Sequence, residues 1–450
     1  MSTARRHLGA GAALSVVAQG GPLLAAAALS IVLARTIGPS GNGHYVLLLT
    51  LVGLTSMAVS LGLHSGITYE VSRRRWSVER ASRAAYLLAL LLGLVGILGG
   101  LGFFLLTHDT VFGGISTPVA LLALASLPLT LAYEYGAVIL LARERYEQYT
   151  GLIVLHAGTL ALIGVGLAVP FGLTGAVAGI PASALIGSIA AVKLLQDEAL
   201  RDPVSDAGSS LQRALRFGIL SWGANLLQQV NYRFDVLILG GFATAADVGV
   251  YSVALTLTGI AWVLPQALQT VLFPRAASLD ESARSGEVTS AESDEAVARA
   301  IRHGVLLMLP TGLVVAVLLL VGVPLVYGHP FHETVPLGFV LLPGVLLIGV
   351  GKIVGSAIIG RGRPRYALYG AAISVPLTLG LYLGLIPPFG AWGAAIGSSI
   401  SYAASSVLGL IFFRRVTAIG LRRAFVPTRE DLTDYRLAAT LARSRLARSR

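Results

Sequence analysis

The sequence has no cysteine and few charged side chains. Because none of its 450 residues is cysteine, disulfides, cysteine zinc sites and thiol nucleophiles are excluded. Aspartate, glutamate, lysine and arginine make up only 12% of the chain, whereas hydrophobic residues make up 55%, and the mean hydropathy is +0.78. A water-soluble protein of this length is not so apolar, so the composition indicates a polytopic membrane protein.

Loops that could carry an active site are also scarce. On the predicted outer face, the longest connection runs from about His108 to Thr117, which is too short for the catalytic loop of a glycan polymerase or ligase. The segment most similar to a phosphate-binding loop is 344–352, but Ile353 stands where a Ser or Thr would bind magnesium. We therefore predict that the protein is not an enzyme and has neither a cofactor nor a metal site.

Hydrophobic stretches follow one another through most of the chain. A membrane-spanning helix needs about 20 apolar residues. Stretches of this kind lie near 9–33, 43–68, 84–106, 118–142, 150–169, 175–195, 215–241, 248–273, 304–327, 335–359, 366–386 and 390–413. We predict an all-α membrane protein with about twelve transmembrane helices in two pseudo-symmetric six-helix lobes. The predicted parts are an N-terminal lobe (1–195), a cytoplasmic connector (196–214), a C-terminal lobe (215–413) and a basic cytoplasmic tail (414–450).

Basic residues lie almost entirely on one side of the predicted membrane. Of the 33 lysines and arginines, 30 fall in the termini and in the connections of one face, and the opposite face carries only Arg35. By the positive-inside rule, both termini are cytoplasmic and the protein is a multi-pass protein of the plasma membrane. The net charge of +11 then reflects topology and attraction to anionic lipid headgroups, and we expect no nucleic-acid partner.

Two motifs occur twice, once in each predicted lobe. Residues 170–179 and 388–397 share the pattern P-F-G-x-x-G-A-x-x-G, and 43–51 aligns with 249–257 around a shared G-x-Y. The two pairs follow the same order at offsets of 218 and 206 residues. Each motif lies at a corner between spans, so the pattern indicates duplicated halves, which many transporters use for alternating access.

Polar residues concentrate on the seventh predicted span. Successive residues of a helix are about 100° apart, which places five polar side chains on one stripe, with an arginine and an aspartate at its edges. These residues are Ser221, Asn225, Gln228, Gln229, Tyr232, Arg233 and Asp235. A stripe of this kind is costly against lipid, so we predict that it lines a water-filled cavity and binds substrate.

Lys352 is the second cation that falls within a predicted span. Together, Arg233 and Lys352 suit an anionic substrate. The alternative is structural: Arg233 would pair with Asp235 or Glu134, and Lys352 would extend toward the cytoplasmic surface.

Two acidic residues within the spans, Glu134 and Glu70, are candidates for coupling to H⁺ or Na⁺. Pairing with nearby arginines such as Arg73 or Arg143 is the interpretation that we favour for both. His64 lies on an apolar helix, where we expect a hydrogen-bonded packing role. After the last span, Thr428 could cap a helix over 429–450 with Asp431 at its third position, and we expect this basic tail to associate with the inner leaflet.

The segment from Val32 to Tyr45, its counterpart from Asp235 to Tyr251 and the two P-F-G-x-x-G-A corners resemble the polysaccharide transporter family, the Wzx-type oligosaccharide flippases of the MOP superfamily. The resemblance covers roughly residues 5–415. It implies a V-shaped, two-lobed, MATE-like fold in which a cationic cavity meets a lipid-linked phosphate.

The function implied by this resemblance is flipping of an undecaprenyl- or dolichyl-linked oligosaccharide from the inner to the outer leaflet, for surface polysaccharide or glycoprotein assembly. The implied partners are the lipid-linked oligosaccharide, membrane lipids and glycan-assembly proteins. One departure is that the N-terminal lobe has no buried Arg or Lys of its own. Two alternatives stay open, a MATE-like multidrug or cation antiporter and a membrane glycan polymerase or ligase.

Overall fold

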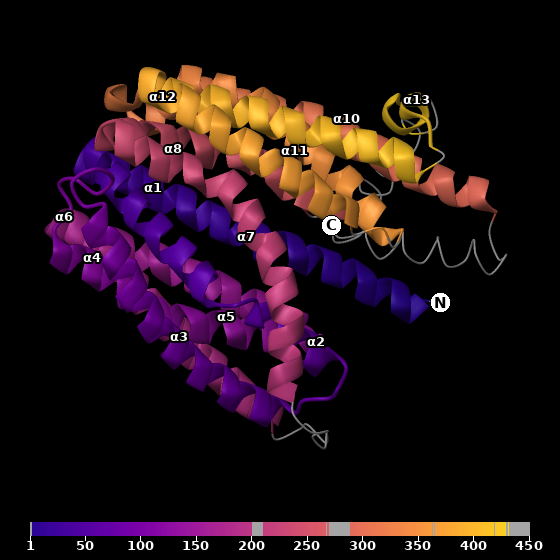
Figure 1. Ribbon diagram of the computed structural model, residues 1–450, viewed down its shortest axis with the longest axis horizontal. Helices are drawn as coiled ribbons and strands as arrows, with labels where there is room; N and C mark the ends of the chain where they lie inside the picture. The colour runs from indigo at the N-terminus through magenta and orange to yellow at the C-terminus, as the bar shows by residue number, and fades with distance from the viewer. Residues whose placement is uncertain are drawn as a thin grey trace, which may run out of the picture. The chain divides into compact units, whose positions relative to one another are not determined.

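The computed structural model is helical throughout the part of the chain that it describes (Figure 1). The described residues are 2–199, 210–266, 268–269, 289–361, 363, 365–417, 419–428 and 431. Eight helices within these ranges are long and apolar enough to cross a membrane. The prediction of an all-α, multi-pass membrane protein is therefore confirmed, whereas the count of twelve spans stays a prediction.

The chain forms two compact units, and each is described here by itself. The first unit comprises Met1–Ile260, Val317–Leu341 and Ala371–Ser401. The second comprises Ala261–Ala316, Leu342–Gly370 and Tyr402–Arg450. The bounds of the two predicted six-helix lobes stay a prediction.

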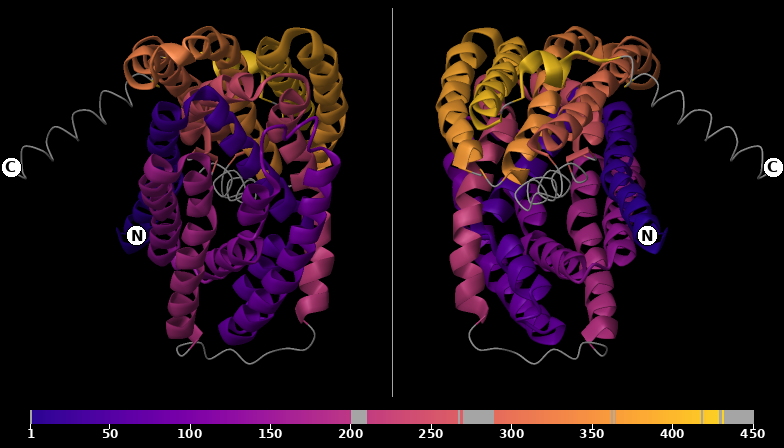
Figure 2. Two further views of the ribbon diagram at one scale, coloured as in Figure 1. Left: turned by 90° about the vertical axis from the view of Figure 1, so that its left-hand side faces the viewer. Right: turned by 90° about the vertical axis from the view of Figure 1, so that its right-hand side faces the viewer.

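The first unit is built mainly from the helices of the N-terminal half of the chain. They are α1 (Ser2–Val59), α2 (Leu63–Ser72), α3 (Val78–Leu106), α4 (Thr117–Leu124), α5 (Leu127–Ala142), α6 (Tyr146–Ala199), α7 (Ser210–Phe242) and α8 (Ala245–Gly259). Helices α3, α5 and α6 run side by side (Figures 1 and 2). Their facing sides bury Ala85, Leu131, Tyr135 and Leu195 in one apolar core, because the apolar positions of each helix recur on the face that meets its neighbours.

Three long helices are bent at glycine. Gly38 in α1 (φ 66°), Gly172 in α6 (φ 57°) and Gly390 in α12 (Arg365–Val416; φ 53°) all have backbone angles outside the helical region. Only glycine adopts such a positive φ without strain. The bends at Gly38 and Gly172 fall between two predicted spans and the bend at Gly390 falls at the first residue of the last one, so glycine provides the corner that separates successive spans.

The two P-F-G-x-x-G corners have the same local structure. The first glycine of each copy carries the bend, with ψ angles of −134° and −130°. At the second glycine, a Cβ atom would lie 1.9 Å from the carbonyl oxygen of Leu167 in the case of Gly175, and 2.0 Å from that of Leu385 in the case of Gly393. The motif therefore repeats because each corner needs one glycine to turn and another to let two backbone segments approach.

The second repeated motif brings its own two copies together. A Cβ atom at Gly43 would lie 1.8 Å from the carbonyl oxygen of Ala245, and one at Gly249 would lie 1.9 Å from that of Pro39. The side chain of Asn42 also donates a hydrogen bond to the Gly249 carbonyl oxygen at 3.2 Å. Helices α1 and α8 of the first unit thus meet backbone to backbone at equivalent positions of the repeat.

Arg35, the single basic residue of the predicted outer face, closes the end of a helix. Its guanidinium donates hydrogen bonds to the carbonyl oxygens of Val326 (2.6 Å) and Leu325 (2.9 Å). Both carbonyls belong to the last turn of the π-helix η2 (Leu318–Tyr327), where carbonyl groups lack partners within the helix. After η2 comes the short 3₁₀-helix η3 (His329–Phe331).

The second unit contains α10 (Ser290–Val317) without its last residue, most of α11 (Thr334–Gly360) and the short helix α13 (Leu421–Phe425). It also contains both ends of α12 and the last two residues of the 3₁₀-helix η1 (Ile260–Trp262). Ile301, Ile353, Ala357 and Phe413 are buried together at its centre. These apolar positions come from α10, α11 and α12, so the core of this unit joins segments that are far apart in the sequence.

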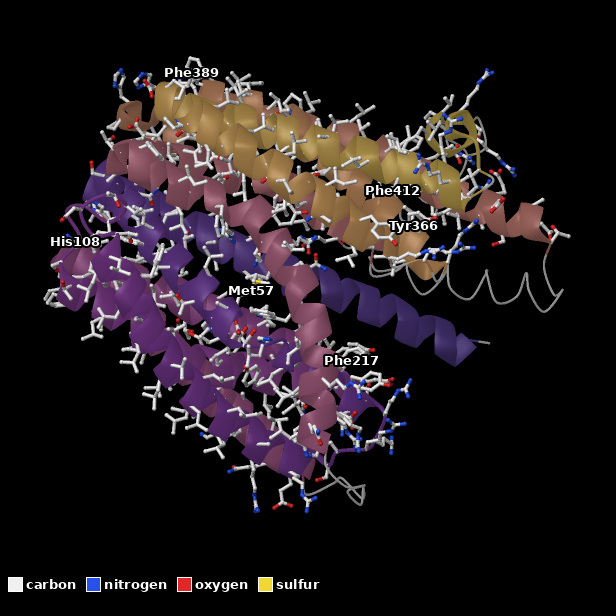
Figure 3. All side chains as sticks on the ribbon, in the orientation of Figure 1. Met57, His108, Phe217, Tyr366, Phe389 and Phe412 are labelled. Atoms are coloured by element: carbon white, nitrogen blue, oxygen red, sulfur yellow. The ribbon has the colours of Figure 1, made fainter. Side chains whose placement is uncertain are left out.

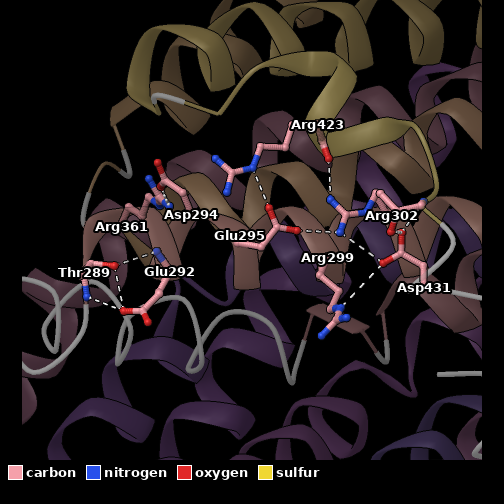
Figure 4. Close-up of polar contacts among 10 residues, drawn as sticks. Thr289, Glu292, Asp294, Glu295, Arg299, Arg302, Arg361, Arg423 and Asp431 are labelled. Carbon is pink, nitrogen blue, oxygen red and sulfur yellow. Dashed lines mark hydrogen bonds and ion pairs between the residues drawn. The ribbon is translucent and has the colours of Figure 1, made fainter. Parts of the chain in front are cut away.

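A buried ion pair attaches the start of the tail to α10 (Figure 4). The Arg302 side chain is only 2% exposed and that of Asp431 is 0% exposed. The Arg302 guanidinium donates to Asp431 Oδ2 (2.7 Å), to Glu295 Oε1 (2.8 Å) and to the carbonyl oxygen of Arg423 (2.6 Å). All three guanidinium nitrogens therefore donate hydrogen bonds within the second unit, and such partners allow a buried charge to be tolerated.

Thr428 and Asp431 make the contact that the sequence predicts. The backbone N–H of Thr428 donates to Asp431 Oδ2 at 2.7 Å, and the Thr428 hydroxyl donates to the same oxygen at 2.9 Å. The helix predicted for 429–450 lies outside the described residues, apart from Asp431. The membrane association of the tail therefore stays a prediction.

The ion pair predicts a specific loss of stability in acid. Burial raises the pKa of the Asp431 carboxyl, but hydrogen bonds from Arg302 and Thr428 outweigh it and lower the pKa from 3.8 to about 2. Because this folded-state pKa lies below that of the unfolded chain, the carboxylate stabilises the folded protein above about pH 4, and the contribution is lost as the pH falls toward about 2. We expect Asp431→Asn to lower the melting temperature at neutral pH, and the difference from wild type to shrink below about pH 4. Thermal unfolding in detergent measures it, and an equal difference at every pH would show that the carboxylate charge plays no part.

Candidate functional site

Helix α7 carries the polar stripe predicted for substrate binding. Four of the stripe side chains keep accessible surface: Gln228, Gln229, Tyr232 and Arg233. The side chains of Ser221 and Asn225 lie outside the described residues. Along the stripe, Gln228 is hydrogen-bonded to Tyr232, as expected for side chains four positions apart on one helix face. The exposed part of the stripe therefore presents amide, phenol and guanidinium groups together.

Arg233 is the charged member of this stripe. Its side chain is exposed, and in the described part of the chain it forms no hydrogen bond or ion pair. It interacts electrostatically with Asp235, but the predicted ion pair with Glu134 is not formed, because Glu134 contacts His64 instead.

Asp235 lies inside the first unit and not on its surface. Its side chain is completely buried and accepts hydrogen bonds from the Tyr251 hydroxyl (2.6 Å) and the Val236 backbone N–H (2.8 Å). Tyr251 and Tyr382 each lie 3.0 Å from the Ser398 hydroxyl. In this structure Asp235 links α7 to α8 and, through Ser398, to α12, so it does not take part in the exposed stripe. Helix periodicity assigned it correctly to a stripe edge, but it could not reveal which helices cover that edge.

Lys352 belongs to the second unit. Its side chain is half-buried, and Nζ lies 4.3 Å from the centre of the Trp262 ring. The ring face attracts a cation, and this interaction is stronger where water is excluded. The Lys352 carbonyl oxygen accepts a hydrogen bond from Gln269 at 2.8 Å. Lys352 is therefore positioned by an aromatic ring, a contact that its isolated place in an apolar span could not predict.

Glu70 forms an arginine pair, as the sequence analysis favours, but with a different partner. Its carboxylate is fully buried and accepts hydrogen bonds of 3.3 Å from two nitrogens of Arg213. The predicted partner was Arg73, which is close in sequence. Helix α2 instead packs along α7, where Tyr69 also stacks on Phe217 at 4.3 Å (Figure 3).

Glu134 and His64 form a pair that sequence reasoning missed. Glu134 Oε2 lies 3.0 Å from His64 Nε2, and the Ser56 hydroxyl donates to the same oxygen at 3.4 Å. The two residues are 70 positions apart on different helices, so neither a local motif nor helix periodicity joins them. The only signal in the sequence is that each is an isolated polar residue in an apolar span. Within the described part of the chain, no group of three His, Asp or Glu side chains is arranged as metal ligands.

The sequence is similar to a family of polysaccharide biosynthesis proteins and to named relatives from two organisms. The family model described as "Polysaccharide biosynthesis protein" matches residues 32–336. A relative from Haloferax volcanii, named as the low-salt glycan biosynthesis flippase Agl15, is 24% identical over 385 residues, covering 83% of this chain and 77% of the relative. A relative from Shigella flexneri, named as an O-antigen transporter, is 23% identical over 407 residues, covering 86% of this chain and 93% of the relative.

Solved structures share the fold. An inward-facing MATE-family multidrug transporter of the MOP superfamily superposes with a TM-score of 0.71 at 17% identity, covering 89% of this chain and 97% of the other. The lipid II flippase MurJ in an inward closed conformation gives 0.70 at 11% identity, covering 91% and 89%. These similarities show the MOP fold for this chain, and the family match shows that the chain belongs to the polysaccharide biosynthesis protein family.

Proposed function

We propose that this protein is a flippase that moves a lipid-linked oligosaccharide from the cytoplasmic to the outer leaflet of the plasma membrane. The observation that carries the proposal is Arg233, an exposed guanidinium without an ion-pair partner in the described residues, on the polar stripe of α7. Two relatives in the comparisons are named as a glycan flippase and an O-antigen transporter, which supports this substrate class. The protein is accordingly a transporter and not an enzyme.

The chemistry of the stripe fits the polar end of such a substrate. A polyprenyl phosphate or diphosphate is anionic, and arginine binds phosphate through two parallel hydrogen bonds. Amide and phenol groups such as those of Gln228 and Tyr232 can bond to sugar hydroxyls. The polyprenyl tail stays in lipid while the head group crosses in the protein, so the glycan never enters hydrocarbon, where its unpaired polar groups would be costly.

Alternating access supplies the movement in this proposal. Both halves of the chain contain the same corner motif with the same glycine bend. Transporters with duplicated halves work by rocking one half against the other. The distribution of basic residues supports cytoplasmic termini. Membrane lipids and glycan-assembly proteins are the partners that we expect.

The test is substitution of Arg233 in cells that lack the chromosomal copy. We expect Arg233→Ala to lower translocation about 10- to 100-fold, because a hydrogen bond to a charged group contributes about 1.5–3 kcal/mol. Arg233→Lys should retain part of the activity, since it keeps the charge but loses the planar fork. Mass spectrometry of lipid-linked glycans, with sidedness probed by an impermeant reagent, measures the accumulation on the cytoplasmic side.

Arg216→Ala is the matched control, because Arg216 is also exposed on α7 but lies 17 residues nearer the helix end that is predicted to be cytoplasmic. It should leave translocation unchanged. If Arg233→Ala restores translocation as well as wild type does, Arg233 is not in the substrate path. If the deletion causes no accumulation but changes sensitivity to cationic drugs, the protein is an antiporter of the MATE type.

A polymerase or ligase receives no support from these findings. The named relatives are a flippase and a transporter, and the solved structures with the same fold are transporters of the MOP superfamily.

A further inference from the structure

Two ionisable side chains meet within the first unit at a depth where charge is costly. His64 of α2 and Glu134 of α5 lie 3.0 Å apart, and their side chains are 31% and 35% exposed. Each lies eight residues before the end of its helix, at Ser72 and Ala142. At about 1.5 Å per residue this is about 12 Å from the helix end, in a hydrocarbon layer about 30 Å thick.

The surroundings of the pair contain polar and aromatic groups. Ser56 of α1 bonds to Glu134, and the Tyr135 ring of α5 meets the His64 ring edge-on at 4.9 Å. The ionisable groups that interact electrostatically with Glu134 are Tyr133, Tyr135 and His156 of α5 and α6. From α3, the Tyr86 hydroxyl lies 3.4 Å from a Cβ atom built at Gly136, two residues after Glu134. On α2 and α7, Glu70 and Arg213 form a further ion pair.

The exposure of this pair separates it from the ion pairs that hold the fold together. In two of those pairs the carboxylate, that of Glu70 or of Asp431, is completely buried. Glu134 instead keeps about a third of its side chain accessible. An accessible charge at this depth is tolerated when it faces water and not lipid, so protons can reach the pair.

The geometry points to a proton-binding site formed by His64 and Glu134, through which proton movement drives the conformational cycle. With the proton bound, imidazolium and carboxylate attract each other and hold α2 against α5. When the proton leaves His64 to water, a neutral imidazole faces a carboxylate, the attraction weakens, and the two helices can separate. This inference rests on the proposed transport function.

The residue types favour a proton over a sodium ion. Histidine is the side chain whose charge ordinarily changes between about pH 5 and 8. Hard cations prefer several oxygen ligands in one shell, whereas this pair offers one carboxylate, one hydroxyl and an imidazole nitrogen. Proton exchange between water, imidazole and carboxylate needs no further reactant.

The first experiment reads proton binding without transport. The Trp222 indole of α7 donates a hydrogen bond of 2.9 Å to the carbonyl oxygen of Met57, next to Ser56. In the full chain, with the other three tryptophans of the four replaced by phenylalanine, Trp222 reports on this region. We expect its fluorescence to follow a pH titration, and His64→Gln or Glu134→Gln to abolish that titration.

Two controls keep this readout interpretable. Glu79→Gln removes the carboxylate of the exposed Glu79–Arg83 pair and should leave the titration intact. The double variant His64→Glu, Glu134→His exchanges the two groups, so it again contains one imidazole and one carboxylate. It should recover the titration if the single variants lost it because the proton site was missing. Misfolding of the single variants would not predict this recovery. A titration that persists in both single variants, or that is absent from wild type, overturns the proton site.

The second experiment measures coupling in vesicles loaded with the polyprenyl-linked glycans of the source cells. For one proton per cycle, a gradient of one pH unit should change the transport rate up to about tenfold. We expect His64→Gln and Glu134→Gln to remove this response while Glu79→Gln keeps it. If Trp222 titrates as expected but wild type moves no glycan, the proton site stands and the proposed flippase function fails. If glycan moves at a rate independent of the gradient, the flippase function stands and the coupling role fails.

Discussion

Replacing Gly175 or Gly393 with alanine should cost about 3 kcal/mol or more and lower the melting temperature markedly. A Cβ atom would lie about 2 Å from the carbonyl oxygen of Leu167 or Leu385, far inside van der Waals contact, and backbone cannot move aside as a flexible side chain can. Overpacking of this kind typically costs about 1–3 kcal/mol and sometimes more, against a total stability of about 5–15 kcal/mol. Size-exclusion chromatography and thermal unfolding of the detergent-purified variants measure the loss.

Each variant has a matched control in its own helix. No atom lies within 4 Å of a Cβ built at Gly166 of α6 or at Gly384 of α12. Alanine there should therefore be neutral or stabilise by up to about 1 kcal/mol through helix propensity. If Gly175→Ala and Gly393→Ala are as stable as these controls, the repeated glycines are not required for close backbone approach.

Breaking the buried pair between Arg302 and Asp431 should have the second largest effect. Arg302→Met removes the closer counter-charge of the buried Asp431 carboxylate and leaves it Arg299 at 3.8 Å. The removal of one partner of a buried pair typically costs about 3–5 kcal/mol. The Arg423 carbonyl oxygen and Glu295 Oε1 also lose the hydrogen bonds that Arg302 donates to them, although Glu295 Oε2 keeps its bond from Arg423 (Figure 4). We expect a much lower melting temperature and greater access of protease to the segment after Phe425.

Two further variants separate charge from packing. The double variant Arg302→Met, Asp431→Leu removes both charges and should recover most of the stability, because an apolar pair of similar volume can replace a buried ion pair. Arg83→Ala breaks the exposed pair with Glu79, whose side chains are 80% and 62% exposed, and should cost less than about 1 kcal/mol. If Arg302→Met is as mild as Arg83→Ala, the tail is not attached through this ion pair.

Sequence reasoning succeeded where a local pattern determines local structure. The P-F-G-x-x-G copies predicted corners, and both first glycines have nearly the same bent conformation, with φ of 57° and 53°. Helix periodicity places the polar residues of α7 on one stripe, where Gln228 and Arg233 are exposed, and the substrate binding of this stripe stays a prediction. The Thr428 contact with Asp431 follows from a three-residue spacing.

The same reasoning failed where the result depends on which helices are neighbours. Glu70 pairs with Arg213, which is 143 positions away, and not with Arg73. Glu134 pairs with His64, although each appeared isolated on its own span. Periodicity shows which residues share a face of one helix, whereas tertiary packing decides which other helix covers that face.

Reconstitution of the purified protein in lipid vesicles tests the proposed function most directly. The vesicles contain polyprenyl-linked oligosaccharides extracted from the source cells, and an impermeant reagent that oxidises sugars reports by mass spectrometry which molecules face outward. A flippase should make inner-leaflet glycans accessible to the reagent over time, and Arg233→Ala should slow this about 10- to 100-fold. If the inner-leaflet glycans stay protected in vesicles that contain folded wild-type protein, with and without a pH gradient, the protein does not flip these lipids.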